Sequence, residues 1–205
     1  MRTTARMAIV MTVAILLIDQ ILKMWVKTHM TLHETIEITS WFKICFVENN
    51  GMAYGMELGS KLLLSIFRIT LTLFLIYYLA RQIKNGKQPR GFLLCLTMIT
   101  AGALGNIIDG MLYGLIFNAS SPYYVSYFVP LGEGYAPFLM GKVVDMFYFP
   151  LIVSTYPEWV PVVGGDPYVF FSPVFNFADS CICVGVALLL LFYRKEVASL
   201  TSGKI

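Results

Sequence analysis

Four long apolar stretches alternate with more polar connections along the chain. They cover residues 7–27, 62–80, 92–112 and 173–193, and a helix needs about 20 apolar residues to cross a bilayer. The pattern therefore predicts four transmembrane helices. The first stretch follows two basic residues, as in a signal peptide, but it continues into Asp19-Gln20-Ile21-Leu22-Lys23 without a cleavage site. We expect it to be an uncleaved helix.

The connections between these stretches differ in pattern. Residues 28–61 contain an alternating segment, Thr35–Thr39, and an aromatic β-prone segment, Trp41–Val47, followed by a turn signal at Asn49-Asn50-Gly51. Residues 113–172 are rich in Gly, Pro and aromatic residues. The sequence thus predicts one all-α membrane domain over residues 1–205. It would carry a small β-platform between helices 1 and 2 and a long loop between helices 3 and 4.

Composition excludes a soluble domain and charge orients the helices. The chain is 58% hydrophobic and 13% charged, whereas soluble domains carry about 25% charged residues. Both terminal segments and the connection at 81–90 are basic, while residues 28–61 and 113–172 carry mixed charge. By the positive-inside rule, both termini are predicted to be cytoplasmic and the two mixed segments extracytoplasmic.

Several polar residues fall inside the predicted helices, where they are costly and mark a functional site by default. With a rise of about 1.5 Å per residue, the predicted topology places all of them in the outer half of the bundle. These residues are Asp19, Lys23, Arg68, Asn106, Asp109, Asn176 and Asp179. The last four form two pairs spaced three apart, and each pair is predicted to share a helix face.

Acids outnumber cations in this layer once Asp145, which follows two valines in the long loop, is included. Such an excess in a dry site favours a shared proton, as in an aspartic dyad. A hydrogen-bond network that only holds the helices together is the alternative, above all for Asp19, Lys23 and Arg68.

Other chemistries have little support in the sequence. His29 and His33 lie four apart, but the surrounding pattern is not helical, which disfavours a metal site. The four cysteines have no disulfide or zinc spacing and are expected to be buried thiols. The sequence contains no P-loop, Gly-x-Ser-x-Gly or His-Glu-x-x-His motif. Carboxylates remain as the candidate acid and base.

The chain resembles signal peptidase II, a family of four-helix aspartic peptidases of the bacterial inner membrane. The resemblance covers about residues 7–193, and five segments match the family's motifs in order. They are Asp19-Gln20-Ile21-Leu22-Lys23, Asn49-Asn50-Gly51-Met52-Ala53-Tyr54, Gly105-Asn106-Ile107-Ile108-Asp109, Val143-Val144-Asp145-Met146-Phe147 and Phe175-Asn176-Phe177-Ala178-Asp179.

The resemblance implies an enzyme that cuts diacylglyceryl-modified prolipoproteins before the lipidated cysteine, without a metal or organic cofactor. Its active site would face the outer leaflet, with Asp145 and Asp179 as the catalytic dyad. The supporting and substrate-binding residues would be Asp19, Lys23, Asn49, Gly51, Arg68, Asn106, Asp109 and Asn176. The expected partners are the prolipoprotein and membrane lipid, with no nucleic acid, and the expected state is a monomer.

The chain departs from the family pattern in two respects. Gly110 stands where the family usually has Arg, and Arg68 is the candidate replacement. The connections 111–142 and 148–172 are longer than usual, and aromatic residues such as Phe117, Tyr127 and Phe128 are expected to form a lid or a membrane-boundary surface. Two rival functions are a proton-coupled transporter, which predicts repeats and polar groups on both sides of the midplane, and a non-catalytic lipoprotein-binding chaperone.

Overall fold

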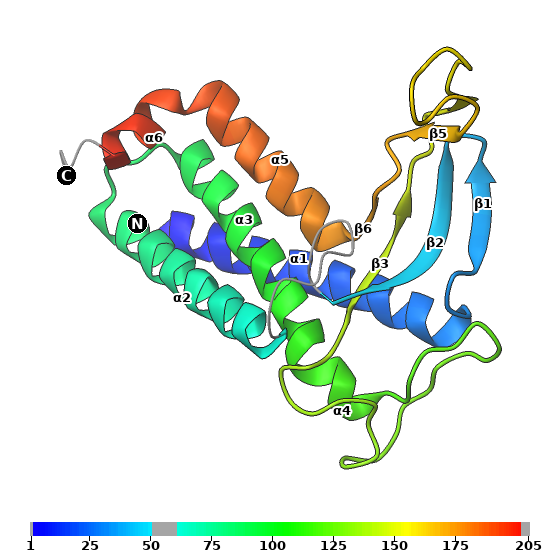
Figure 1. Cartoon of the computed structure of the whole chain (residues 1–205). Coiled ribbons are helices and arrows are strands. Elements are labelled where there is room, and N and C mark those ends of the chain that lie inside the picture. The colour runs from blue at the N-terminus through cyan, green and yellow to red at the C-terminus, as the bar shows by residue number, and fades with distance from the viewer. Residues whose placement is uncertain (1, 51–60, 202–205) are drawn as a thin grey trace.

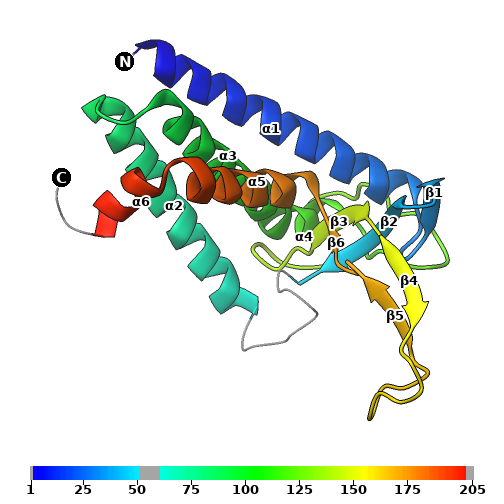
Figure 2. The ribbon, with the colours of Figure 1, turned by 90° about the horizontal axis from the view of Figure 1, so that it is seen from above.

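The structure, a computed structural model, describes residues 2–50 and 61–201. A bundle of helices occupies one end of the molecule and a β-structure the other (Figure 1). The four main helices are α1 (Arg2–His29), α2 (Lys61–Asn85), α3 (Arg90–Ile108) and α5 (Phe177–Phe192). The start of α1 and the end of α5 lie at the end of the bundle away from the strands, as Figures 1 and 2 show.

Three of these helices are confirmed as long and apolar enough to cross a membrane: α1, α2 and the helix that runs from Arg90 to Ile116. The fourth, α5, is apolar but has only 16 residues. The predicted stretch 173–193 began too early because Val174–Phe175 form a strand, β6, and the helix starts two residues later. A short polar helix, α6 (Arg194–Thr201), follows α5.

The central helix is α3, which packs against α1, α2 and α5. Glycine makes the contact with α5 close, because a Cβ atom on Gly102 would lie 2.4 Å from the carbonyl oxygen of Ala178. The C-terminal end of α3 continues through a π-helical turn, η2 (Asp109–Tyr113), into α4 (Gly114–Ile116). Turns of this π-helical kind are rare in proteins, and those that occur are often found at functional sites.

A four-stranded antiparallel sheet covers the end of the bundle where α1 ends and α5 begins. Its order is β1 (Thr35–Thr39), β2 (Phe42–Asn49), β3 (Val143–Tyr148) and β6. The β-platform predicted between helices 1 and 2 is therefore present, but β3 comes from the connection predicted to be a loop and β6 from the start of the predicted fourth helix. The fold is therefore not purely α-helical. Strand β3 pairs with β2 on one side and with β6 on the other. Its residues Val144 and Met146 belong to the same core cluster as Val26 of α1.

The rest of the long connections lies outside this sheet. A separate hairpin, β4 (Ile152–Thr155) with β5 (Pro167–Phe170), projects to one side of the bundle (Figure 2). Tyr127 and Phe128 are exposed, as a lid or a membrane-boundary surface requires. Phe117 is fully buried and makes an edge-to-face contact with Tyr113, so it belongs to the core and not to such a surface.

Candidate active site

Asp145 lies on an inner strand of the sheet. Its strand, β3, is hydrogen-bonded to β2 on one side and to β6 on the other, and Asp145 pairs with Val47. Only 3% of Asp145 is exposed. The sequence placed this residue in a loop, whereas in the structure the register of β3 fixes its position.

Asp179 lies in the first turn of α5 and takes part in a capping box with Asn176. The Asn176 side chain accepts a hydrogen bond from the Asp179 backbone N–H at 2.9 Å, and the Asp179 carboxylate accepts one from the Asn176 N–H at 3.4 Å. The two residues were predicted to share a helix face. Asn176 instead precedes the helix and is its N-cap, an arrangement that the spacing of amide and acid also favours.

Two side-chain amides connect the two aspartates. The Asn176 amide nitrogen donates to Asp145 Oδ1 at 2.7 Å and to Asn106 Oδ1 at 3.1 Å. The Asn106 amide nitrogen in turn donates to Asp179 Oδ1 at 2.7 Å. A third amide, that of Asn49 at the end of β2, donates to Asp145 Oδ2 at 3.2 Å. Residues from β2, β3, α3 and α5 therefore meet at one point.

The environment of Asp145 favours its protonated form. Burial, followed by the negative charge of Asp179, raises the pKa of Asp145 to about 7, while hydrogen bonds from Asn49 and Asn176 act in the opposite direction. A carboxyl group with this pKa holds a proton over much of the neutral range and can release it. This is the property required of a general acid near pH 7.

A buried charge cluster lies beneath the amides. Lys23 Nζ is 2.8 Å from both Asp19 Oδ2 and Asp109 Oδ2, and it donates to Asn106 Oδ1 at 2.9 Å. Asp19 also accepts a hydrogen bond from the Ala178 backbone N–H at 2.9 Å, which ties α1 to the start of α5. The cluster thus orients Asn106 and α5, and it acts on the two aspartates through them.

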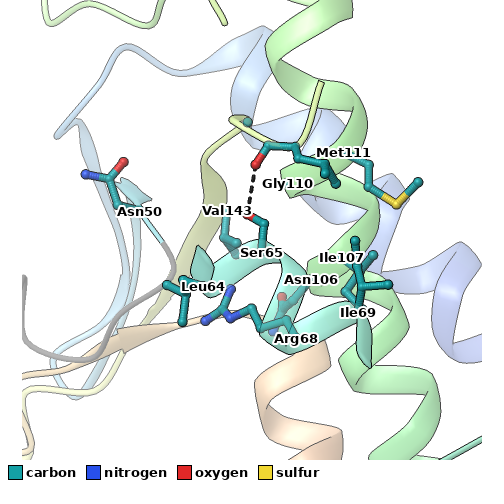
Figure 3. Close-up of a pocket in the computed structure, with 12 residues that line it drawn as sticks. Asn50, Leu64, Ser65, Arg68, Ile69, Asn106, Ile107, Gly110, Met111 and Val143 are labelled. Atoms are coloured by element: carbon teal, nitrogen blue, oxygen red, sulfur yellow. Dashed lines mark hydrogen bonds between the residues drawn. The ribbon is translucent and has the colours of Figure 1, made fainter. Parts of the chain in front are cut away.

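Arg68 and Gly110 line the same small pocket between α2 and α3, together with Asn106 (Figure 3). Arg68 is close enough to Asp179 and Asp145 for a favourable electrostatic interaction with both. The Ser65 hydroxyl donates to the Leu139 carbonyl at 2.8 Å and fixes this part of α2 to the loop before β3. A side chain at Gly110 would meet little, since the nearest atom to its Cβ is 4.0 Å away.

Gly51, a predicted site residue, lies outside the described residues. His29 stacks on Trp25 and contacts its carbonyl oxygen, and the described ranges contain no group of three His, Cys, Asp or Glu residues arranged to hold a metal ion.

Gln20, for which no role was predicted from the sequence, joins the charge cluster. Its amide nitrogen donates to Asp109 Oδ1 at 2.9 Å and to Asp19 Oδ2 at 3.1 Å, and its carbonyl oxygen accepts from the Tyr113 hydroxyl at 3.2 Å. Its position next to Asp19 was the signal available in the sequence.

A second buried ion pair was also missed. Lys27 Nζ lies 2.5 Å from Glu48 Oε1 and donates to the Ser120 hydroxyl at 2.8 Å, and Lys142 approaches Glu48 at 3.2 Å. Burial alone would raise the pKa of Glu48, but the charge of Lys27 and its hydrogen bond bring it below the usual value. The signal was the position of Lys27, four residues after Lys23 on the same face of α1.

This ion pair fixes the two strands beside the aspartates. Glu48 directly precedes Asn49 on β2, and Lys142 directly precedes β3. The ammonium group of Lys27 is also enclosed by aromatic rings, with the centroids of Phe117 and Tyr135 both 5.2 Å away. The Lys27–Glu48 pair therefore anchors the register of β2 and β3 to α1.

Comparison with known proteins supports the resemblance seen in the motifs. The family model for signal peptidase (SPase) II matches residues 11–194. The chain belongs to the signal peptidase II family. It is 51% identical over 192 residues to a lipoprotein signal peptidase of Porphyromonas gingivalis, covering 94% of this chain and 84% of that protein. It is 38% identical over 186 residues to a lipoprotein signal peptidase of Amoebophilus asiaticus, covering 88% and 74% of the two chains.

Solved structures share the fold. A bacterial membrane enzyme structure obtained by the in meso method at 2.3 Å resolution has a TM-score of 0.61 and 23% sequence identity, covering 94% of this chain and 90% of the other. A second, at 1.9 Å resolution, has a TM-score of 0.58 and 25% identity, covering 90% of each chain. Family membership implies a membrane-embedded protease that removes signal peptides from prolipoproteins.

Proposed function

We propose that Asp145 and Asp179 form an aspartic dyad that cuts diacylglyceryl-modified prolipoproteins before the lipidated cysteine. The observation that carries the proposal is the pair of amides, Asn106 and Asn176, that joins one oxygen of each carboxylate. This arrangement holds the two carboxyl groups at one site and leaves the second oxygen of each for other hydrogen-bond partners. Asp145, with its raised pKa, is the member that holds the proton.

The reaction then proceeds by general acid–base catalysis. Asp179 removes a proton from a water molecule as the water oxygen attacks the scissile carbonyl carbon, and Asp145 gives its proton to the carbonyl oxygen. When the tetrahedral intermediate collapses, the C–N bond breaks and the proton held by Asp179 passes to the leaving nitrogen. The hydroxyl proton returns to Asp145, so the dyad ends in its starting state.

The location of the dyad suits a lipid-bearing substrate. Asp145 and Asp179 lie where the sheet meets the outer ends of α3 and α5, at the end of the bundle opposite both termini (Figure 1). With the termini cytoplasmic, as their basic residues predict, the site lies at the outer leaflet of the bacterial inner membrane. The acyl chains of a prolipoprotein can then stay in the lipid while the peptide enters the site. We propose the monomer as the working unit.

The test is cleavage of a purified prolipoprotein by the wild-type protein and by Asp145→Asn and Asp179→Asn. General acid–base catalysis typically contributes about 10²–10⁴-fold, so each variant should lose activity by at least about that factor. Asp166→Asn, which changes an acid in the β4–β5 connection, is the matched control and should cleave normally. Cleavage retained in both dyad variants would exclude this mechanism. Binding of prolipoprotein without any cleavage by the wild type would favour the chaperone.

Arg68 is proposed to supply the positive charge that the family usually places at the position of Gly110. Both residues line the same pocket, and Arg68 interacts electrostatically with the dyad. Arg68→Met should therefore reduce kcat, and adding Gly110→Arg in the same chain should restore part of the loss. Met111 also lines this pocket, so Met111→Arg is the control for a positive charge added there. Equal rescue by both arginines would show that the position of Gly110 has no special role.

A further inference from the structure

An apolar groove lies at the opposite end of the bundle from the dyad. It runs between the first half of α1 and the last half of α2, and its volume is about 600 Å³. In Figures 1 and 2, α1 and α2 approach each other near the chain termini and diverge toward their other ends. Both helices pack against α3, and the groove lies between them. The lining residues are Arg2, Ala5, Ala8, Ile9, Thr12, Val13, Ile76, Leu79, Ala80, Ile83 and Lys84.

The dimensions of the groove match one leaflet of a membrane. From Arg2 to Val13 the α1 wall covers 12 residues, and the 11 steps between the first and the last span about 17 Å along the helix. Half of a hydrocarbon core is about 15 Å thick. The groove therefore has room for acyl chains lying parallel to the helices. Two of its apolar side chains, Ile9 and Val13, are strongly exposed in the bundle and so lie in contact with lipid in the membrane.

Charge is confined to one end of the groove. Arg2 and Lys84 are its two cations, both are exposed, and they lie at the end that faces the termini. The described residues that line the groove include no acid. Two cations beside an apolar channel fit an anionic headgroup attached to acyl chains. The same charges oppose the basic N-terminal region of a signal peptide.

We propose that this groove binds an anionic glycerophospholipid of the leaflet on the side of the termini. The headgroup phosphate lies between Arg2 and Lys84, and an acyl chain follows the apolar walls past Ala5 and Ala80. The site is separate from the dyad, so the proposal does not depend on the proposed reaction.

Native mass spectrometry of the full chain in detergent tests the site, with dioleoylphosphatidylglycerol as the anionic probe and dioleoylphosphatidylcholine as the zwitterionic one. A cation near a lipid headgroup is worth about five-fold in affinity. Arg2→Gln and Lys84→Gln should each weaken phosphatidylglycerol binding by about that factor, and together by about 25-fold. Phosphatidylcholine binding should change little.

Matched controls lie three or four residues away in sequence. Arg6 lies on α1 outside the groove and Lys87 follows α2 outside it, so Arg6→Gln and Lys87→Gln should keep wild-type binding. Equal loss in the controls, or equal binding of the two lipids, would overturn the proposal. A photoactivatable phosphatidylglycerol should label residues 5–13 and 76–83. Labelling confined to other helices would also overturn it. So would protection of these residues from labelling by a second protein chain or a basic peptide that displaces no lipid.

Discussion

The hydrogen bond from Asn49 to Asp145 offers a direct test of how the protein sets the proton affinity of its candidate acid. The Asn49 amide donates to Asp145 Oδ2 and stabilises the carboxylate form, which lowers the pKa of Asp145 from the level that burial alone would give. Asn49→Ala removes this donor and leaves the other donor, Asn176, in place. The pKa of Asp145 should therefore rise above about 7.

The expected size follows from the geometry. Hydrogen bonds to charged groups contribute about 1.5–3 kcal/mol, and the 3.2 Å distance is at the long end of the normal range. The lower value, about 1.5 kcal/mol, corresponds to about one pKa unit because one unit equals about 1.4 kcal/mol. If Asp145 acts as the protonated acid, activity falls when it loses its proton. The alkaline fall in activity should thus move from about pH 7 to about pH 8.

The assay is kcat/KM for cleavage of a lipidated peptide measured from about pH 5 to about pH 10, since kcat/KM reports the ionisations of the free enzyme. Asn50→Ala is the matched control. Its side chain is exposed and accepts a hydrogen bond from Lys61, so its loss should leave the profile in place. An unshifted or acid-shifted profile in Asn49→Ala would refute the assignment of Asp145 as the acid, and an equal shift in Asn50→Ala would refute the role of the hydrogen bond.

Three other changes probe the scaffold, all by thermal unfolding in detergent. Lys23→Met should destabilise the fold by about 3–5 kcal/mol because it leaves two buried carboxylates without their cation, whereas Lys43→Met removes only a partly exposed pair with little effect. Gly102→Ala should cost about 1–3 kcal/mol by pushing α5 from α3. Folding lowers the pKa of Glu48 below its unfolded value of 4.5. The contribution of Glu48 to the stability of the fold is therefore present above pH 4.5 and is lost as the pH falls below that value. Glu48→Gln should remove this pH-dependent loss of stability.

Each of these has an outcome that would contradict it. Equal effects of Lys23→Met and Lys43→Met would mean that the buried cluster carries no special energetic weight. Gly110→Ala, where a Cβ has room, is the reference for Gly102→Ala, and similar losses in both would exclude the helix contact as the cause. If the stability of Glu48→Gln falls at low pH as much as that of the wild type, other carboxylates govern the loss of stability.

Local patterns were enough for the helices and for part of the site. Runs of about 20 apolar residues predict membrane-spanning helices, and three of the four runs are helices long and apolar enough to cross a bilayer. Asn176 and Asp179 interact with each other through a capping box, which depends on four consecutive residues. Asp19 and Lys23 pair one turn apart on α1 for the same reason.

Contacts between distant segments could not be read in this way. Asn49 and Asp145 are 96 residues apart in sequence, and their hydrogen bond exists only because β2 and β3 are neighbours in one register. The β-prone residues of β3 are compatible with a strand but do not show which strand it pairs with. The connection was therefore predicted to be a loop. The Lys27–Glu48 pair was hidden for a similar reason, since a lysine at the end of a predicted helix is normally expected to reach water.

The sequence by itself determined the membrane character, the presence of polar residues inside the apolar helices and the family to which the chain belongs. Tertiary structure alone decided that Asp145 lies on an inner strand, that two amides join it to Asp179, and that α1 and α2 leave an apolar groove at the other end. The physical reason is that hydropathy and capping act over a few residues. Strand register and helix divergence depend instead on which distant surfaces pack together.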